Sequence, residues 1–442
     1  IWFQKNVISR TFRTTASSPP PLVLFFLFFG MSLFLHVGQC GNQVALPLWK
    51  LAESELSVTS GNCPLFDEDD GFARTIFIDS EPKVVTRTCC MLRRIRPSNV
   101  VLESSGCGNN WSMGFSSCID EESESNRLFT NSINAIRKES ERFDSMRSIV
   151  FVHSIGGGTG SGMGSALLQH VRDHFASSWV VPIVVGPFSR GDNPLQSYNS
   201  LFSLQYLNEF SDAVVYTDND ILSTTVGGRL GFEAMNQEFA FDIAANFFPL
   251  KERTSQWSST SFGSILSTLC PLQRLRFLRI GSAHHAQRQG PSAHWEDLTR
   301  LASDRLGLER GAKESVAFAS HVVARGEGHQ DAEDIRRLLS KTPRLQKTAQ
   351  WHPQPVRVSS TPLSFPNSTR TVGLAVNSSE MAAVLRRLSR SAAVKFHSKA
   401  YLHCYRRYGI TEVDFAEAFE SLTNIVSDYE EMSRISDQTP TD

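Results

Sequence analysis

The sequence predicts an α/β protein built around a doubly wound parallel sheet. The main observation is a glycine-rich stretch, GGGTGSG at residues 156–162, which follows a short apolar, β-branched segment at 148–153. Apolar residues then recur at helical spacing from Met163 to Phe175. A second segment of the same kind, with an apolar strand at 32–37 and a glycine loop at 38–43, precedes a further helix. Repeated strand–loop–helix units build parallel sheets that bind ligands at the ends of their strands.

The loop at 156–162 has the composition of an anion-binding turn. Backbone N–H groups and a helix N-terminus converge there, and glycine lets them approach a phosphate without an intervening Cβ. No Gly-Lys-Ser/Thr follows the loop, so it is not a P-loop, and the dinucleotide-binding spacing fails as well. The alternative is a flexible Gly/Ser linker, which the apolar strand and amphipathic helix on either side disfavour.

Size and composition limit the function classes. The 442 residues provide for two or three domains, and neither the net charge of −1 nor the 40% hydrophobic content argues for disorder or a nucleic-acid surface. The eight cysteines form no Cys-x-x-Cys pair, so we interpret them as reduced, cytosolic thiols. His284, His285 and His294 lack the spacing of metal ligands, and we predict that they lie in a solvated loop.

The first thirty residues stand apart from the rest. They precede the first methionine, Met31, and combine a basic start, three prolines and an apolar run at 22–29. A signal peptide has a similar pattern, but the apolar run continues into the predicted strand at 32–37, and cleavage there would remove that strand. The run is also too short to span a membrane. We therefore expect residues 1–30 to be a non-native or disordered extension.

Further along the chain, polar residues follow the ends of other predicted strands. The strand at 74–78 ends in Asp79-Ser80-Glu81-Pro82, and two carboxylates at such a position suit Mg²⁺, with a solvated turn as the alternative. A third glycine-rich turn occupies 105–111. The strand at 180–185 precedes a turn at 191–194, and the strand at 212–216 is followed by Asn219, whose amide can read a purine edge.

Phe232 and Asn236 lie four residues apart in a predicted helix from Gly231 and therefore share one face. On the residues alone, Phe232 is interpreted as a core residue. Towards the C-terminus, the segments 315–324 and 371–376 are predicted strands, and 331–339 is a short charged helix. A helix begins near Met381, and Thr411 with Asp414 forms a capping box for the last one.

The motifs at 38–43 and 156–162, in this order and separation, resemble those of the tubulin family. The resemblance implies a tubulin-like doubly wound parallel-sheet GTPase domain, a mixed α/β intermediate domain and a C-terminal helical pair. It also implies GTP or GDP as ligand and Mg²⁺ held by Glu81 with Asp79 beside it. In the family, an Asn of the third loop closes over the terminal phosphate, and two Asn and an aromatic residue bind guanine. The residues implied for the nucleotide are Gly38, Gln39, Cys40, Gly106, Asn109, Ser154, Gly157, Gly158, Thr159, Gly160, Asn219, Phe232 and Asn236, with Asp192 and Gln196 less well matched.

By this resemblance we divide the chain into five parts, the first of which is the extension at 1–30. Residues 31–250 form the GTP-binding domain with its core helix, 251–378 the intermediate domain, 379–432 the helical region and 433–442 a short tail. The tail holds two aspartates, so the glutamate-rich tail of alpha- and beta-tubulins is missing. The segments at 79–85, 235–237 and 398–415 are most similar to delta-tubulins, with zeta- and epsilon-tubulins as close alternatives.

The implied function is that of a GTP-binding structural component of the microtubule cytoskeleton, in the cytoplasm and at the centriole or basal body. Its expected partners are other tubulin subunits, contacted longitudinally, and microtubule or centriolar proteins, with no nucleic acid or membrane. Two alternatives are a nucleotide-dependent enzyme on a related core and a bacterial-type cell-division GTPase. In tubulin polymers a loop of one subunit caps the next nucleotide; here 262–267 matches that loop. Ser267 stands where the usual acid would be and Ser264 replaces another, so we expect at most weak GTPase activity.

Overall fold

The computed structural model describes most of the chain from Met31 to Asp437. The described residues are 31–58, 63–119, 126–191, 193–228, 231–250, 262–286, 293–307, 315–328, 335, 337, 339 and 347–437. The strands are β1 (Met31–Val37), β2 (Thr75–Asp79), β3 (Val100–Leu102), β4 (Met146–Ser154), β5 (Trp179–Gly186), β6 (Val214–Asp218), β7 (Phe277–Ala286), β8 (Ala317–Gly326), β9 (Val356–Thr361) and β10 (Ser368–Ser378). The predicted extension at 1–30 and tail from 438 onwards lie outside the described residues.

Helices connect these strands. They are α1 (Gly38–Val58), α2 (Pro82–Met91), α3 (Trp111–Ile119), α4 (Asn126–Ser140), α5 (Gly164–His174), α6 (Gln196–Phe210), α7 (Asn219–Thr225), α8 (Phe232–Phe247), α9 (Phe262–Leu269), α10 (Trp295–Arg305), α12 (Met381–His397), α13 (Leu402–Arg406) and α14 (Glu412–Asp437). The glycine loop after β4 forms a single π-helical turn, η2 (Thr159–Met163), before α5. The predicted strand–loop–helix unit around 156–162 is confirmed. In the other unit the expected loop at 38–43 is wrong, because α1 begins at Gly38 directly after β1.

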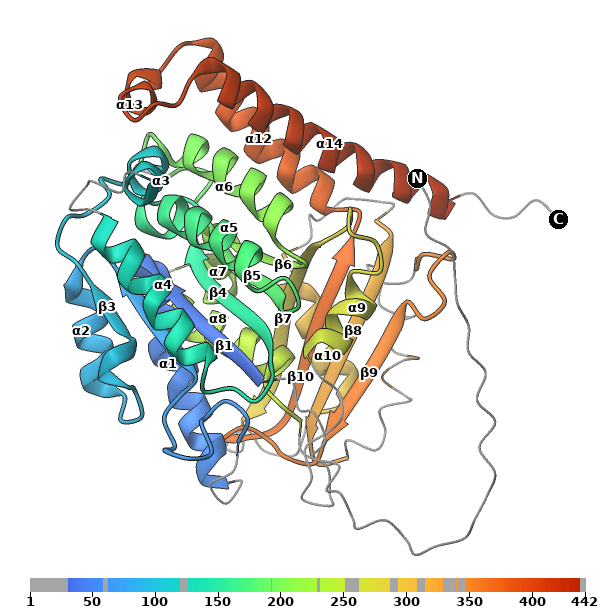
Figure 1. The fold of residues 1–442 in the computed structure, drawn as a ribbon. Helices are drawn as coiled ribbons and strands as arrows, with labels where there is room; N and C mark the ends of the chain where they lie inside the picture. Colours follow the sequence, from blue (N-terminus) through green and yellow to red (C-terminus); the bar gives the residue numbers. More distant parts are fainter. Residues whose placement is uncertain are drawn as a thin grey trace, which may run out of the picture.

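One sheet of ten strands runs through the molecule (Figure 1) in the order β3-β2-β1-β4-β5-β6-β7-β10-β8-β9. From β3 to β7 all neighbours are parallel, as predicted, while β10 is antiparallel to both β7 and β8. Because these strands are parallel, the carboxyl ends of β1, β4 and β6 lie at the same edge of the sheet.

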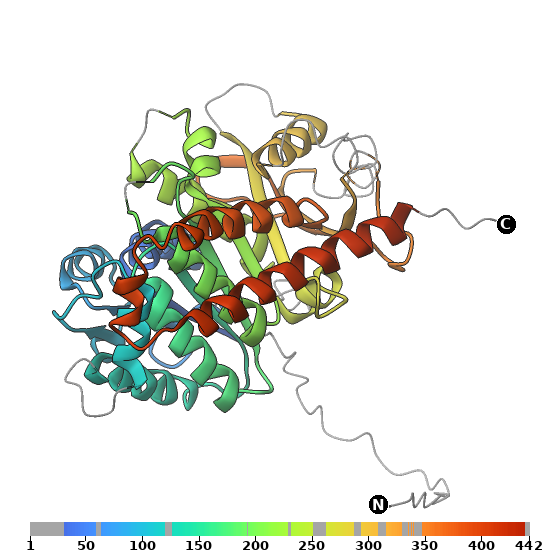
Figure 2. The ribbon, with the colours of Figure 1, turned by 90° about the horizontal axis from the view of Figure 1, so that it is seen from above.

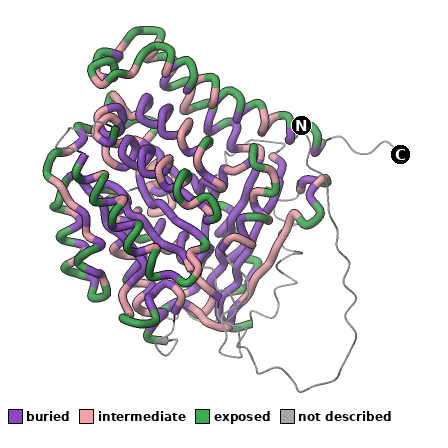
Figure 3. The backbone as a smooth tube through the Cα atoms, in the orientation of Figure 1, coloured by how far each residue is buried: buried purple, intermediate pink, exposed green. Residues whose placement is uncertain are grey.

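Both faces of the parallel part are buried (Figure 3). Alternation along β1 shows why: Leu33, Leu35 and Val37 pack under α3–α6 and the C-terminal helices, whereas Phe34 packs against α1 and α8 on the other face. A smaller core joins α10 to β7, β8 and β10, with Leu298 among its members. The near-continuous apolar strands of the sequence are therefore those covered by helices on both sides.

The C-terminal helices lie across one side of the molecule (Figure 2). Helices α12 and α14 pack against each other and against α6, so they cover the helical layer of the parallel sheet. Asp414 accepts hydrogen bonds from the backbone N and the hydroxyl of Thr411, at 2.6 and 2.7 Å, at the start of α14. The predicted cap of the last helix is confirmed.

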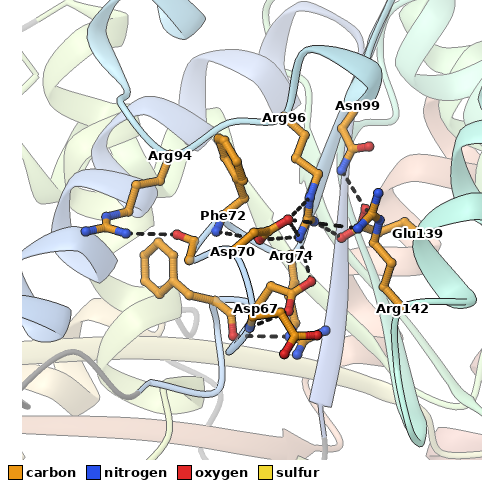
Figure 4. A network of polar contacts seen from close by, with 12 residues as sticks. Asp67, Asp70, Phe72, Arg74, Arg94, Arg96, Asn99, Glu139 and Arg142 are labelled. Atoms are coloured by element: carbon orange, nitrogen blue, oxygen red, sulfur yellow. Dashed lines mark hydrogen bonds and ion pairs between the residues drawn. The ribbon is translucent and has the colours of Figure 1, made fainter.

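A buried charge network holds the loop that leads into β2 (Figure 4). The Arg96 guanidinium, whose side chain is 6% exposed, lies 2.5 Å from Asp67 and Glu139 and 2.6 Å from Asp70. Asn99 donates a further hydrogen bond to Glu139, at 3.0 Å. This ties the 67–74 loop to α4 and to the segment before β3, because an arginine among three acids stabilises all of them at once.

Some sequence expectations were wrong. His284 and His285 were expected in a solvated loop but lie in β7, where they pair with β10. The segment 262–267 was expected as a loop but forms the start of α9, with Phe262, Ile265 and Leu266 buried. In both cases contacts with strands distant in the sequence determine the secondary structure, which the local composition does not indicate. The short helix predicted at 331–339 lies largely outside the described residues.

Candidate nucleotide-binding site

Four segments meet at the carboxyl ends of neighbouring parallel strands: the turn into α1 at Gly38 (the first loop), the turn after β2 at 79–81, the loop after β3 at 105–111 (the third loop) and the central glycine loop after β4. In the parallel register, Val37 of β1 lies opposite Ile78 of β2 and His153 of β4, so the turns that follow these strands are neighbours. Gly38 has a φ of +73°, and a Cβ there would lie 2.7 Å from the backbone N of Gly160. Only glycine can adopt this left-handed conformation and still lie so close to the backbone of the central loop at 156–162.

The central loop presents unpaired backbone donors. The N–H of Gly156 bonds the hydroxyl of Ser154, at 3.1 Å. In the part of the chain that the structure describes, the N–H groups of Gly157 and Gly158 donate no hydrogen bond. Such donors need a partner, and at the edge of a parallel sheet just before a helix they suit an anion.

The third loop packs directly on the central one. A Cβ on Gly158 would lie 2.5 Å from the carbonyl oxygen of Cys107, and one on Gly162 would lie 2.1 Å from that of Trp111. Asn109 adopts a left-handed conformation with φ of 51°, and its Oδ1 is the atom nearest to a Cβ placed on Gly157, at 4.0 Å. The structure thus brings the Asn109 side chain to the glycine loop.

The end of β2 contacts both loops. Ser80 shares a 2.6 Å hydrogen bond with the hydroxyl of Thr159, and its carbonyl oxygen accepts one from the N–H of Gly106, at 3.3 Å. Thr159, Gly106 and the 79–81 segment are therefore brought together, as the predicted site requires.

Asp79 and Glu81 differ in environment. Asp79 is buried, and burial raises the pKa of its carboxyl to about 6. Its Oδ1 accepts a hydrogen bond from the N–H of Glu81, at 3.3 Å. Glu81 is exposed, and its Oε1 is the atom nearest to a Cβ placed on Gly106, at 3.9 Å. Two oxygen donors beside the loops fit a hard cation that keeps several waters. Among the described residues, no group of three or more His, Cys, Asp or Glu side chains is arranged to hold a metal ion.

The residues predicted for the base lie on α7 and α8. Asn219 is the half-buried first residue of α7, where the neighbouring Asp218 caps the helix by accepting from the N–H of Ile221, at 3.0 Å. Phe232 is 58% exposed and lies edge-on to Phe188, with ring centroids 6.2 Å apart. Its interpretation as a core residue is wrong, and its open ring face is available for stacking.

Asn236 connects the α8 face to the first loop. Its amide donates to Oε1 of Gln43 on α1, at 3.3 Å. In the same first turns of α1, Gln39 is exposed and Cys40 is half-buried, with burial raising the pKa of the Cys40 thiol to about 12. The Asn236–Gln43 hydrogen bond thus joins α8 to the first turns of α1, beside the central glycine loop.

The less well matched candidates do not gain support. Asp192 lies outside the described residues, and the Gln196 amide bonds the carbonyl of Phe188, at 2.9 Å. Two asparagines that sequence reasoning did not single out organise the site. Asn42, fully buried, bonds the carbonyls of Gly38 and Ile78, at 2.9 and 3.0 Å. Asn199 donates to the carbonyls of Asn109 in the third loop and Gly156 in the central loop, at 2.8 and 2.9 Å. The only signal for Asn42 was its place in the 38–43 motif.

Two cavities lie near these elements. One of about 220 Å³ is lined by Ser80, Gly106 and Cys107 beside the phosphate loops. A larger one of about 810 Å³ lies between α7, α10, α12 and α14, away from the loops. Two arginines in its wall pair with carboxylates of the same wall, Arg387 with Asp218 at 3.0 Å and Arg386 with Glu430.

Comparison with known proteins agrees with this geometry. Residues 32–227 match the model of the Tubulin/FtsZ family, GTPase domain. The chain is 25% identical to the human tubulin delta chain, over 89% of this chain and 98% of that protein. It is 26% identical to the maize tubulin beta-3 chain, over 91% and 95% respectively, and 25% identical to the tubulin beta-1 chain of Chondrus crispus, over 90% and 92%.

The matched range spans the three loops and the strands that position them. The predicted fold and the resemblance stated from the two glycine motifs are confirmed, and the domain implies binding of guanine nucleotides. Residues 32–227 form a GTPase domain of the Tubulin/FtsZ family, and the chain is similar to tubulin delta and beta chains along most of its length.

Proposed function

We propose that this protein is a GTP-binding structural subunit of the microtubule cytoskeleton, of the delta-tubulin type. The observation that carries the proposal is the meeting of three loops at one sheet edge, where Gly38 contacts Gly160 and Gly158 contacts Cys107 without room for a side chain. Such packing places backbone donors, not side chains, at the strand ends, which is what a polyphosphate requires.

The nucleotide would lie across the edge from the glycine loop to α8. Gly157, Gly158 and Asn109 would donate to the phosphates, and Phe232 would stack on the base. Asn219 and Asn236 would read its polar edge through amide donors and acceptors. Two separate amides suit guanine, which offers both kinds of group.

Mg²⁺ is the proposed metal, with Glu81 as its exposed oxygen donor and Asp79 beside it. The cation would neutralise phosphate charge. The buried Asp79 carboxyl fits this role, because burial disfavours its charge unless a positive group is near. Its bond to the N–H of Glu81 keeps the two acids next to each other.

The partners and location follow from the family. Tubulins interact with other tubulin subunits, and we propose longitudinal contacts of that kind, together with centriolar or microtubule proteins. The proposed location is the cytoplasm, at the centriole or basal body, as the similarity to delta chains suggests. We propose neither nucleic acid nor membrane as a partner; within the described residues, no helix has the length and apolar character of a membrane span. The divisions at 31–250, 251–378 and 379–432 remain a prediction.

Hydrolysis is proposed to be weak. Ser267, at the position assigned to the usual acid, is exposed on α9, one turn after Ser264. A hydroxyl does not act as a carboxylate base near neutral pH, and loss of a water-activating group typically costs ~10²–10⁴ in rate. The protein would then cap a neighbouring nucleotide without stimulating its hydrolysis.

Nucleotide content is the decisive measurement. The purified full-length protein should release GTP or GDP on denaturation, detected by ion-exchange chromatography. An empty protein that also fails to bind added GTP with Mg²⁺ would contradict the proposal. Tight binding of ATP instead of GTP would favour the alternative of a nucleotide-dependent enzyme on a related core.

A further inference from the structure

Asn199 occupies a central position between the two loops that face the terminal phosphates. It lies in the first turn of α6 and is fully buried. Its Nδ2 donates to the backbone carbonyls of Asn109, at 2.8 Å, and Gly156, at 2.9 Å. One carbonyl belongs to the third loop and the other to the central glycine loop, so the Asn199 amide bridges them. The Asn193 amide, near the start of α6, donates to the same two carbonyls at longer distances, 3.4 and 3.2 Å.

The oxygen of the Asn199 amide also accepts two hydrogen bonds. Oδ1 of Asn199 accepts from the backbone N–H of Trp111, at 2.8 Å, and from the hydroxyl of Tyr405, at 2.5 Å. Two acceptors face Nδ2 and two donors face Oδ1, so only one orientation of the amide satisfies all four bonds. By donating to Oδ1, the Tyr405 hydroxyl and the backbone N–H of Trp111 therefore fix the direction of Nδ2, which bonds the two loops.

Tyr405 brings the C-terminal helices into this arrangement. It is fully buried on α13, and the preceding residue, Cys404, accepts a hydrogen bond from the side chain of Asn110, at 3.0 Å. Asn110 in turn accepts from the backbone N–H of Ser112 at the start of α3, at 2.9 Å. The third loop is thus bonded to α13 directly at Cys404, and through Asn199 at Tyr405.

We propose that Asn199 is a positioning residue for the terminal phosphate, which sets the separation of the Asn109 loop and the glycine loop, and that Tyr405 links this separation to the C-terminal helices. The inference rests on the proposed binding of GTP. Since the third loop, with Asn109, is the one that the family resemblance assigns to the terminal phosphate, a change in this spacing would affect a triphosphate more than a diphosphate.

The test is the substitution Asn199→Asp in the full-length protein. A carboxylate oxygen would replace the Nδ2 donor and face the carbonyls of Asn109 and Gly156, so the bridge would be replaced by repulsion. Loss of buried hydrogen bonds of this kind weakens binding by roughly 5- to 150-fold. We expect GTP affinity to fall by about tenfold or more and GDP affinity by less than about threefold.

Asn246→Asp is the matched control. Asn246 is also buried, and its Nδ2 also donates to two backbone carbonyls, those of Asp242 at 2.9 Å and Gly281 at 3.2 Å. It lies on α8 against β7, away from the phosphate loops. This variant should lose comparable thermal stability and leave the ratio of GTP to GDP affinity unchanged.

Tyr405→Phe is the second variant, in case Asn199→Asp does not fold. It removes one donor to Oδ1 and should shift the GTP-to-GDP ratio in the same direction by about three- to tenfold. Its control is Tyr429→Phe, a buried tyrosine that bonds the backbone of Phe277 at 2.9 Å.

Fluorescent GTP and GDP analogues, with Mg²⁺, give both affinities, and melting curves give stability. Equal losses for GTP and GDP in Asn199→Asp, or an unchanged ratio in Tyr405→Phe, would overturn the inference. A change of ratio in the controls as large as in the variants would do the same. A parent protein that binds no guanine nucleotide would instead overturn the proposed function, so the two failures are distinguishable.

Discussion

Helix α8 runs from the face proposed for the base to β7, and a buried acid lies in its second half. Asp242 is 5% exposed and accepts a hydrogen bond from the hydroxyl of Ser282 on β7, at 2.5 Å. Burial raises the pKa of its carboxyl to about 8, with Glu238 adding to the effect and the Ser282 bond opposing it. Near neutral pH, Asp242 is therefore protonated in most folded molecules, and Asp242→Asn replaces a neutral acid with a neutral amide.

The sign of the pH dependence follows from this shift. The unfolded carboxyl has an ordinary pKa of 3.8, so between that value and about 8 the folded state binds more protons than the unfolded state. The free energy of unfolding then falls as pH rises through this window, by up to about 1.4 kcal/mol per pH unit. From pH 5 to pH 7 the loss for Asp242 alone is up to about 2.7 kcal/mol.

Asp242→Asn should remove this slope. The Asn Oδ1 can still accept the Ser282 hydroxyl, so the variant should be more stable than the parent at pH 7.5, by about 1–3 kcal/mol. At pH 4.5 the two should be nearly equal. Asp144 is exposed and supplies the control. Asp144→Asn should leave the change in the free energy of unfolding between pH 4.5 and pH 7.5 the same as in the parent.

Urea unfolding at pH 4.5, 6 and 7.5, followed by circular dichroism, measures these free energies. The quantity compared is the free energy of unfolding of Asp242→Asn minus that of the parent. The reasoning is refuted if this difference is negative at both pH values and more negative at pH 7.5 than at pH 4.5. That result would mean that the folded protein prefers the charged carboxylate, through an interaction stronger than the cost of burying it.

The other predictions concern the base, the buried network and hydrolysis. Asn236→Ala should weaken GTP binding by about 1–3 kcal/mol. It should cost little stability, because the hydrogen bond from Asn236 to Gln43 is long. Unchanged GTP affinity in a calorimetric titration would show that Asn236 does not read guanine. Arg96→Met should lower the free energy of unfolding by about 3–5 kcal/mol, because three acids lose their shared cation, and a loss below about 1 kcal/mol in urea would contradict this. Single-turnover GTP hydrolysis should not accelerate as the protein self-associates; a rate that rises steeply with concentration would refute the assignment of Ser267, as would an unchanged rate for Ser267→Glu in a demonstrated polymer.

The parts of the site that the sequence predicted are those encoded in a few consecutive residues. A glycine loop between an apolar strand and an amphipathic helix carries its own signal, because glycine is needed where backbone meets backbone. The contact of Gly38 with Gly160 explains why both loops are glycine-rich at the same sheet edge. Asn219 and Phe232 were assigned through the family resemblance, and only the structure showed that the Phe232 ring is exposed.

The parts that were missed depend on contacts between distant segments. Asn199 and Tyr405 are 206 positions apart, and nothing in the sequence near either residue indicates a partner. The helix α9 was missed because its buried side, with Ile265 and Leu266, is matched to strands far along the chain. His285 lies in β7 because the pairing with β10 outweighs a local composition typical of loops.

Substitutions of different glycines in the central loop test different properties, either the packing of the loop or its binding of phosphate. A Cβ on Gly162 would meet the carbonyl oxygen of Trp111 at 2.1 Å, so loss of binding in Gly162→Ala would report damaged packing. The nearest atom to a Cβ on Gly157 is 4.0 Å away, and its N–H donates no hydrogen bond within the described chain. Gly157→Ala should therefore melt within a few degrees of the parent and yet bind GTP about tenfold or more weakly, because the methyl group would occupy space proposed for a phosphate. Normal GTP affinity in this variant would place the phosphates elsewhere on the sheet edge.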